Sequence, residues 1–234
     1  MSAPISLVKW KQSHRLVLSK YPPIDLFDDL SSPEDWEYLA QAESRTNPRI
    51  YDTIGDLSLV PPKRRVSGNG ASWLMAPFTH ISRERRSRFS DGSYGVYYCA
   101  HSLETAIRET TYHQERFLRA TQEEAGWVLQ MRELIAKVSH EFTDLREGTY
   151  SELLNPDDYG AAQGFAHSCR NGGGDGIIYP SQRHEGGECL AAFWPDVIGL
   201  PKQGSHWQYH WNGQRIDYVK KLSIGEERSL PFKL

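Results

Sequence analysis

The stretch from Tyr94 to Leu118 constrains the fold most, because a short apolar run passes there directly into an amphipathic helix. Residues 94–101 are aromatic and apolar, which is typical of a buried strand. Ser102 is a favourable helix N-cap, and apolar residues at 3.6-residue spacing follow it as far as Leu118. The sequence therefore predicts a fold that mixes strands with helices.

Strand patterns dominate the rest of the chain after residue 94. The segments with these patterns are Trp127–Leu145, which predicts a strand pair, Gly176–Ser181, Cys189–Trp194 and a terminal hairpin around Asn212-Gly213. One more helix is expected to begin at Asp157 or Asp158 and to end at the glycines 172–174. The predicted class is α+β, with helices inserted among the strands.

The first 47 residues are expected to form a helical extension packed on a single globular domain of residues 48–234. Ser32-Pro33-Glu34-Asp35 combines an N-cap, a proline at the first helical position and an acidic first turn. The helix would turn Trp36, Leu39 and Ala40 inward and stop near Asn47-Pro48.

Charge and cysteine content exclude several functional classes. The 234 residues carry 27 basic and 30 acidic side chains, a net charge of −3, which argues against holding nucleic acid by bulk charge. The three cysteines are far apart and form no CxxC, so neither a disulfide framework nor a zinc cluster is expected. Without an apolar run of about 18 residues or an apolar leader, the chain is expected to be cytoplasmic, with no membrane contact.

A polar stripe borders the apolar face of the helix after Ser102. Thr105, Glu109 and His113 recur every four residues and therefore share one side of that helix. Such a stripe is either the wall of a cleft or a solvated helix flank, and the spacing alone leaves both interpretations open.

Several residue types that suit a nucleotide accompany this stripe. They are Arg88 before the first strand, Tyr97 and Tyr98 within it, Glu109 on the helix, and Ser181 and Arg183 in a turn after a later strand. The guanidinium group of arginine matches phosphate geometry, and an aromatic ring stacks on a flat heterocycle. A carboxylate near a sugar stabilises the positive charge that develops as a glycosidic bond breaks. This chemistry fits cleavage of NAD, although the spacing does not single it out.

Three ordered segments, residues 65–80, 88–117 and 172–195, resemble the RES-domain proteins, the toxins of RES–Xre toxin–antitoxin systems. The resemblance covers about residues 50–200. It implies a split β-sheet core like that of ADP-ribosyltransferases. It also implies a toxin that uses NAD as its substrate, moves ADP-ribose to a protein target or to phosphate or water, and so arrests growth.

The resemblance also assigns roles to individual residues. Arg88, Glu109 and Ser181 match the arginine, glutamate and serine for which the family is named, and the family's tyrosine maps best to Tyr98, with Tyr97 as its neighbour. His113 and Arg183 are expected to help hold NAD.

The sequence departs from the family at two positions. The segment around the family arginine differs from the usual pattern, so Arg85 and Arg86 are rivals to Arg88 for phosphate. Ile107 stands where many transferase toxins carry Glu or Gln, which weakens the case for transfer to an arginine.

The resemblance finally implies a partner, an Xre-type antitoxin that blocks the NAD cleft. No metal is expected, because the histidines 206 and 210 alternate with tryptophans in the terminal hairpin and fit cross-strand packing. Two alternatives remain: an inactive module that binds NAD without cleaving it, and a ribonuclease toxin that uses His113 and nearby arginines. The near-neutral charge disfavours the ribonuclease.

Overall fold

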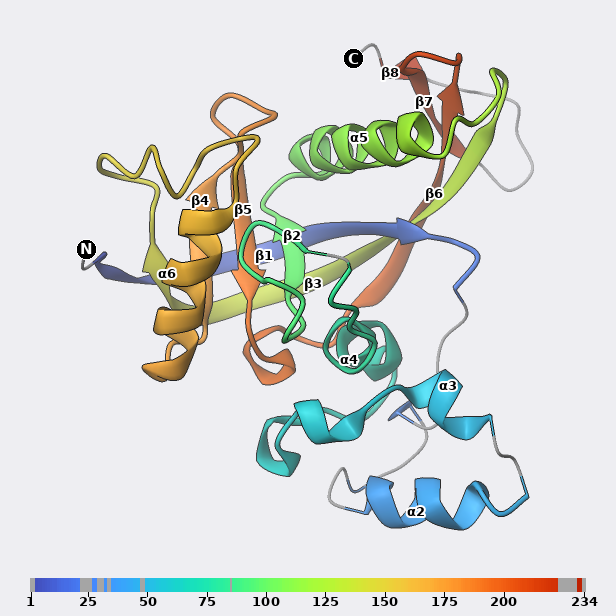
Figure 1. Ribbon diagram of the computed structural model, residues 1–234, viewed down its shortest axis with the longest axis vertical. Helices are drawn as coiled ribbons and strands as arrows, with labels where there is room; N and C mark the ends of the chain where they lie inside the picture. The colour runs from blue at the N-terminus through green and yellow to red at the C-terminus, as the bar shows by residue number, and fades with distance from the viewer. Residues whose placement is uncertain are drawn as a thin grey trace.

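The computed structural model in Figure 1 describes residues 3–21, 27–28, 32, 35–46, 49–84, 86–222 and 231–232. It confirms the α+β class. The strands are β1 (Ile5–Leu18), β2 (Tyr97–Ala100), β3 (Val128–Asp144), β4 (Gly176–Pro180), β5 (Glu188–Ala192), β6 (Lys202–Trp211), β7 (Ile216–Leu222) and β8 (Pro231–Phe232). The helices are α2 (Trp36–Glu43), α3 (Ile50–Ile54), α4 (Ala71–Thr79), α5 (Leu103–Ala120) and α6 (Gly160–Asn171), with short 3₁₀ turns at Leu57–Leu59, Pro62–Arg64 and Pro195–Val197.

The sheet is split, as the family resemblance implied. Strand β1 runs antiparallel along one edge of β3, from the pair Ile5–Thr143 to the pair Leu18–Met131. The other edge of β3 is shared, because β6 occupies its first half and β4 only its last two residues. One arm of the sheet therefore continues through β4, β5 and β2, and the other through β6, β7 and β8.

The expected helical extension is wrong for residues 5–18, which form strand β1 inside the sheet. The segment alternates buried and exposed residues only in part, and its partner strand lies more than 100 residues away, so its local pattern is weak. The sheet thus includes residues on both sides of the expected boundary at residue 47.

Helix α2 lies where a helix was expected, but it differs in one inward residue. Trp36 and Ala40 are fully buried, whereas Leu39 is 38 % exposed. Of the residues expected to start and stop this helix, Pro33, Glu34, Asn47 and Pro48 lie outside the described residues.

The expected strand pair at Trp127–Leu145 is in fact the single strand β3. The register shifts between Arg132 and Leu134, where the pairing with β6 is irregular. A bulge of this kind interrupts the alternation of a strand without turning the chain. The broken pattern therefore mimicked two shorter strands.

The other expected elements are present. Ser102 caps α5 by accepting a hydrogen bond from the amide of Thr105, and α6 starts at Gly160, close to the expected Asp158. Strands β6 and β7 form the hairpin around Asn212-Gly213, where Gly213 has a left-handed φ of 94°. Strand β8 adds to β7 beyond this hairpin.

Two apolar clusters cover opposite faces of the sheet. One includes side chains of α4, and the other includes side chains of α5 and α6. Figure 1 shows α4 and α5 on opposite sides of β1 and β2. Neighbouring residues of a strand face opposite sides, so Tyr97 joins the α4 cluster and Tyr98 packs toward α5. Strand β2 thereby delivers Tyr98 to the space under α5.

Replacing Trp10 with alanine tests whether β1 belongs to the core. Trp10 is 5 % exposed and stacks on His101. We expect Trp10→Ala to lower the free energy of unfolding by about 3–5 kcal/mol, measured by urea denaturation. The control Lys11→Ala, on an exposed neighbour, should change it by less than about 0.5 kcal/mol. Equal small effects in both variants would mean that β1 is dispensable.

Candidate active site

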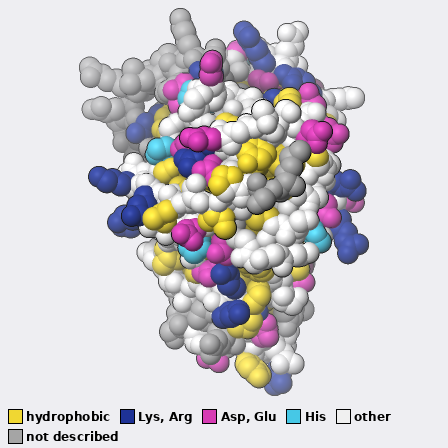
Figure 2. Space-filling model, turned by 90° about the vertical axis from the view of Figure 1, so that its left-hand side faces the viewer, with side chains coloured by type: hydrophobic (Ala, Val, Ile, Leu, Met, Phe, Trp, Pro, Cys, Tyr) yellow, Lys and Arg dark blue, Asp and Glu magenta, His cyan; other side chains and the backbone are white. Residues whose placement is uncertain are grey.

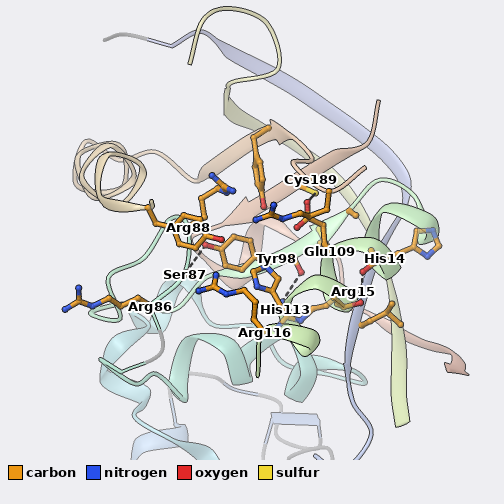
Figure 3. A pocket seen from close by; sticks show the side chains of 18 residues that line it. His14, Arg15, Arg86, Ser87, Arg88, Tyr98, Glu109, His113, Arg116 and Cys189 are labelled. Carbon is orange, nitrogen blue, oxygen red and sulfur yellow. Dashed lines mark hydrogen bonds between the residues drawn. The ribbon is translucent and has the colours of Figure 1, made fainter. Parts of the chain in front are cut away.

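A cavity of about 460 Å³ opens between α5, the ends of β1 and β2, and the turn after β4 (Figure 3). The side chains that line it include His14, Arg15, Leu16, Arg86, Ser87, Arg88, Tyr98, Glu109, Thr110, His113, Arg116, Tyr159, Tyr179, Arg183 and Cys189. Five of the expected site residues line this cavity directly: Arg88, Tyr98, Glu109, His113 and Arg183. The sixth, Ser181, is hydrogen-bonded to Glu109.

Glu109 and Ser181 form a direct pair although they lie 72 positions apart in the chain. The Oγ of Ser181 donates to Oε1 of Glu109 at 2.6 Å. The same Oγ accepts the backbone N–H groups of Arg183 and His184 at 3.1 and 3.0 Å. Because both acceptor sites of the hydroxyl are occupied, its hydrogen is directed at the carboxylate.

The turn that carries Ser181 is closed against helix α5. The amide of Ser181 donates to the carbonyl of Gly187 at 2.7 Å, and the Oγ1 of Thr105 lies 2.9 Å from Nδ1 of His184. A Cβ on Gly187 would come within 2.7 Å of Thr105 Oγ1, so this close approach requires glycine.

Helix α5 turns its polar stripe toward the site. Thr105 is 1 % exposed and contacts the turn, while Glu109 and His113 line the cavity. The structure thus confirms the interpretation of this stripe as the wall of a cleft.

Arg88 is the buried member of the arginine segment. It is 8 % exposed, its Nη1 donates to the carbonyl of Asn155 at 2.7 Å, and its guanidinium lies 4.7 Å from the Tyr159 ring. Arg86 is exposed at the cavity rim. The remaining rival, Arg85, lies outside the described residues.

Arg183, which also lines the cavity, is fixed in a similar way. Its guanidinium carbon lies 3.4 Å from the centre of the Tyr112 ring, and its Nη2 donates to the carbonyl of Pro156 at 2.9 Å. Stacking on a ring holds a guanidinium in one plane and leaves its other face free.

The phenol of Tyr98 links strand β2 to the arginine segment. It accepts the amide of Phe89 and donates to Oγ of Ser87, both at 2.9 Å. Burial raises the pKa of Tyr98 to about 12, so the hydroxyl stays protonated at neutral pH. Its neighbour Tyr97 is fully buried on the other face, under the guanidinium of Arg15. Of the two candidate tyrosines, the structure brings Tyr98 to the cavity.

Two arginines of the site, Arg15 and Arg116, were not predicted from the sequence. Arg15 donates from Nη1 to the carbonyl of Tyr98 at 2.9 Å, and burial lowers its pKa. It comes from β1, whose place in the sheet the local pattern did not reveal. Arg116 lies two turns after Glu109 on α5, so helical spacing already placed it near the same face.

His14 lines the end of the cavity at β1, and a buried carboxylate behind it holds its ring. Nδ1 of His14 lies 2.8 Å from Oε1 of Glu133, which is 4 % exposed. Burial alone would raise the pKa of Glu133, but the hydrogen bonds from His14, the Ser205 amide and the Trp207 indole outweigh it and lower the pKa. Glu133 therefore stays ionised and faces His14 as a fixed negative charge.

The thiol of Cys189 lies 3.8 Å from Oε1 of Glu109. Burial raises the pKa of Cys189 well above its ordinary value, and the nearby Glu109 charge raises it further. The group therefore remains a thiol at neutral pH and is a poor nucleophile.

Positive charge dominates the cavity. Five arginines line it, at positions 15, 86, 88, 116 and 183, against the single carboxylate of Glu109. In the described part of the chain, none of the five lies within 4 Å of a carboxylate. Basic and acidic side chains are intermixed on the face shown in Figure 2, so the excess in the cavity is local.

Among the described residues, no group of three or more His, Cys, Asp or Glu side chains is arranged to hold a metal ion. In the same residues, every helix is too short or too polar to cross a bilayer.

Comparison with known proteins identifies the family. Residues 62–212 match the model of the RES domain, and the chain belongs to the RES domain family. It is 32 % identical over 206 residues to the uncharacterized protein y4oC of Sinorhizobium fredii. The aligned region covers 88 % of this chain and 85 % of that protein. A crystal structure of the MbcT–MbcA toxin–antitoxin complex of M. tuberculosis is similar at 13 % identity, with a TM-score of 0.43 and coverage of 86 % and 85 %.

The two neighbouring tyrosines provide a matched pair of variants. Tyr98→Phe removes two hydrogen bonds and leaves the Phe89 amide without its partner, so we expect a loss of about 1–3 kcal/mol in the free energy of unfolding. In the described residues the hydroxyl of Tyr97 has no partner, so Tyr97→Phe should be neutral or stabilising. Chemical denaturation measures both. A larger loss for Tyr97→Phe would contradict this assignment of the two faces.

The ionisation of His113 gives a direct probe of the cavity charge. His113 reaches solvent at the cavity, yet desolvation by the surrounding protein lowers its pKa, which Glu109 partly opposes. NMR titration should show His113 titrating below its ordinary value of about 6.5. Glu109→Gln removes the opposing charge and should lower the pKa further. Glu104→Gln is the control and should leave it unchanged, whereas a rise in Glu109→Gln would refute the assigned geometry.

Proposed function

We propose that the protein is an enzyme that cleaves the bond between nicotinamide and ribose in NAD. The observation that carries this proposal is the Glu109–Ser181 pair, held at 2.6 Å in a cavity lined by arginines. A carboxylate aimed into such a cavity suits a substrate with a reactive sugar at one end and phosphates beyond it. Membership of the RES domain family supports the same function.

Glu109 is the proposed catalytic carboxylate. As the C–N bond lengthens, the bonding electrons leave with nicotinamide, which departs as a neutral molecule and needs no proton. Positive charge builds on the ribose, and a nearby carboxylate stabilises that charge more in the transition state than in the substrate. Ser181 orients the carboxylate by donating to Oε1.

Tyr98 and His113 are proposed to orient the substrate. The phenol of Tyr98 already donates its one hydrogen to Ser87, so the proposed role of Tyr98 is to pack its ring against nicotinamide, and the protonated phenol cannot serve as a base at neutral pH. His113 has a lowered pKa and is therefore mainly neutral at pH 7, so it can donate or accept a hydrogen bond at the ribose or diphosphate.

Arg88 and Arg183 are the proposed diphosphate ligands. Both line the cavity, and both guanidinium groups are already held by aromatic rings, at Tyr159 and Tyr112. Preoriented guanidinium groups lose little conformational entropy when they bind phosphate. Arg86 remains the alternative to Arg88 in this role.

The biological role that fits this chemistry is that of a toxin. ADP-ribose would pass to a protein target, to phosphate or to water, and loss of NAD or modification of the target would arrest growth in the cytoplasm. An Xre-type antitoxin that fills the cavity would hold the enzyme inactive. These points rest on the resemblance of the chain to RES-domain toxins.

Release of nicotinamide from NAD by the purified protein tests the proposal, and Glu109→Gln sharpens it. The exchange keeps the size of the side chain and removes its charge, so we expect turnover to fall about 10²–10³-fold while NAD binding, followed by calorimetry, changes much less. Glu104→Gln serves as the control, since Glu104 is paired with Arg108 outside the cavity.

Two results would argue against this assignment. Wild-type protein that binds NAD tightly but releases no nicotinamide would be the inactive binding module. Near-normal turnover in Glu109→Gln with loss of turnover in Glu104→Gln would move the catalytic role to Glu104.

A further inference from the structure

The five cavity arginines fall into two groups. Arg15, Arg88 and Arg183 each donate a hydrogen bond to a backbone carbonyl. Arg86 and Arg116 are exposed at the rim and make no hydrogen bond or ion pair in the described part of the chain. The guanidinium carbon of Arg116 lies 5.8 Å from the centre of the Tyr112 ring, and its charge contributes to the lowered pKa of His113. Within the described residues, no contact that stabilises the fold therefore explains why Arg86 and Arg116 are charged.

The acidic residue nearest to Arg116 in the sequence does not neutralise it. Glu115 accepts a hydrogen bond from the amide of Ile216 at 2.8 Å and pairs with Arg119 at 2.9 Å. The cavity therefore retains four formal positive charges when five arginines are set against one glutamate. NAD brings two negative charges on its diphosphate and one positive charge on its nicotinamide ring, so it leaves most of this excess unmatched.

If the nicotinamide ribose of a dinucleotide lies at Glu109, the arginines at the rim lie near its adenosine end. Glu109 fixes the position of the reactive ribose, and the buried Arg88 suits the diphosphate beyond it. The adenosine ribose then lies farthest from Glu109, toward the rim. Figure 3 shows Arg116 extending toward the Arg86–Ser87 segment, away from Cys189 and Glu109.

We propose that the rim arginines Arg86 and Arg116 bind a third phosphate, the 2′-phosphate of NADP, and that NADP is the preferred substrate. A phosphomonoester carries about −1.5 to −2 charges at neutral pH and accepts paired hydrogen bonds from guanidinium groups. This inference rests on the proposed cleavage of the dinucleotide and specifies its substrate.

Competition between the two dinucleotides tests the inference. Initial rates of nicotinamide release should give a kcat/KM about tenfold or more higher for NADP than for NAD. Arg116→Gln should lower the ratio of the two kcat/KM values about tenfold, since it removes a charge-assisted hydrogen bond to phosphate. The matched control is Arg108→Gln on the same helix, whose side chain pairs with Glu104 outside the cavity. This control should leave the ratio unchanged.

A binding experiment separates this inference from the proposed function. Calorimetry with the full chain should show adenosine 2′,5′-bisphosphate binding about tenfold more tightly than 5′-AMP, with the difference lost in Arg116→Gln. If neither dinucleotide releases nicotinamide, the proposed cleavage fails, but this difference still supports the third-phosphate site.

Equal affinity for the two nucleotides, together with equal kcat/KM for the two dinucleotides, would overturn the inference. It would also be overturned if NADP is not preferred and added inorganic phosphate accelerates NAD cleavage only while Arg116 is intact. The rim would then bind the phosphate that accepts ADP-ribose.

Discussion

The pairing of β1 with β3 is the interaction on which the rest of the structure depends. It runs along most of one edge of β3 and so leaves the opposite edge to be divided between β4 and β6. The split places the arm β4–β5–β2 on one side of the molecule, where β2 and the turn after β4 both meet α5. The same ladder brings His14 and Arg15 into the cavity wall. A single long-range pairing thus sets both the shape of the sheet and the charge of the site.

The sequence predicted what local patterns encode. The capped helix α5, the strand before it and the hairpin at Asn212-Gly213 are determined by nearby residues, and family motifs led to Glu109, Ser181 and Tyr98. The prediction failed where a strand depends on a distant partner strand, or where an irregular register interrupts the alternation of its residues. Strand β1 is stabilised by a partner more than 100 residues away, and the irregular register at Arg132 made β3 resemble two strands. Arg15 was missed for the same reason as its strand.

The cavity concentrates positive charge that the composition of the chain conceals. The protein as a whole carries a net charge of −3, yet the arginines come from β1, the segment before β2, α5 and the turn after β4. Like charges gathered in a partly desolvated space repel one another, so the arrangement costs free energy in the absence of a ligand. An anionic ligand removes that repulsion when it binds, and its affinity is correspondingly sensitive to ionic strength.

The carbonyl groups that hold Arg88 and Arg183 belong to a single loop. Arg88 and Arg183 lie 95 positions apart in the chain, yet both donate to one short stretch, the carbonyls of residues 153, 155 and 156. A guanidinium group has five N–H donors, and these contacts use only Nη1 of Arg88 and Nη2 of Arg183, so both side chains keep free donors for an anion. The loop that contains these carbonyls therefore sets the orientation of two cavity arginines at once, and a change that shifts the loop would displace both guanidinium groups together.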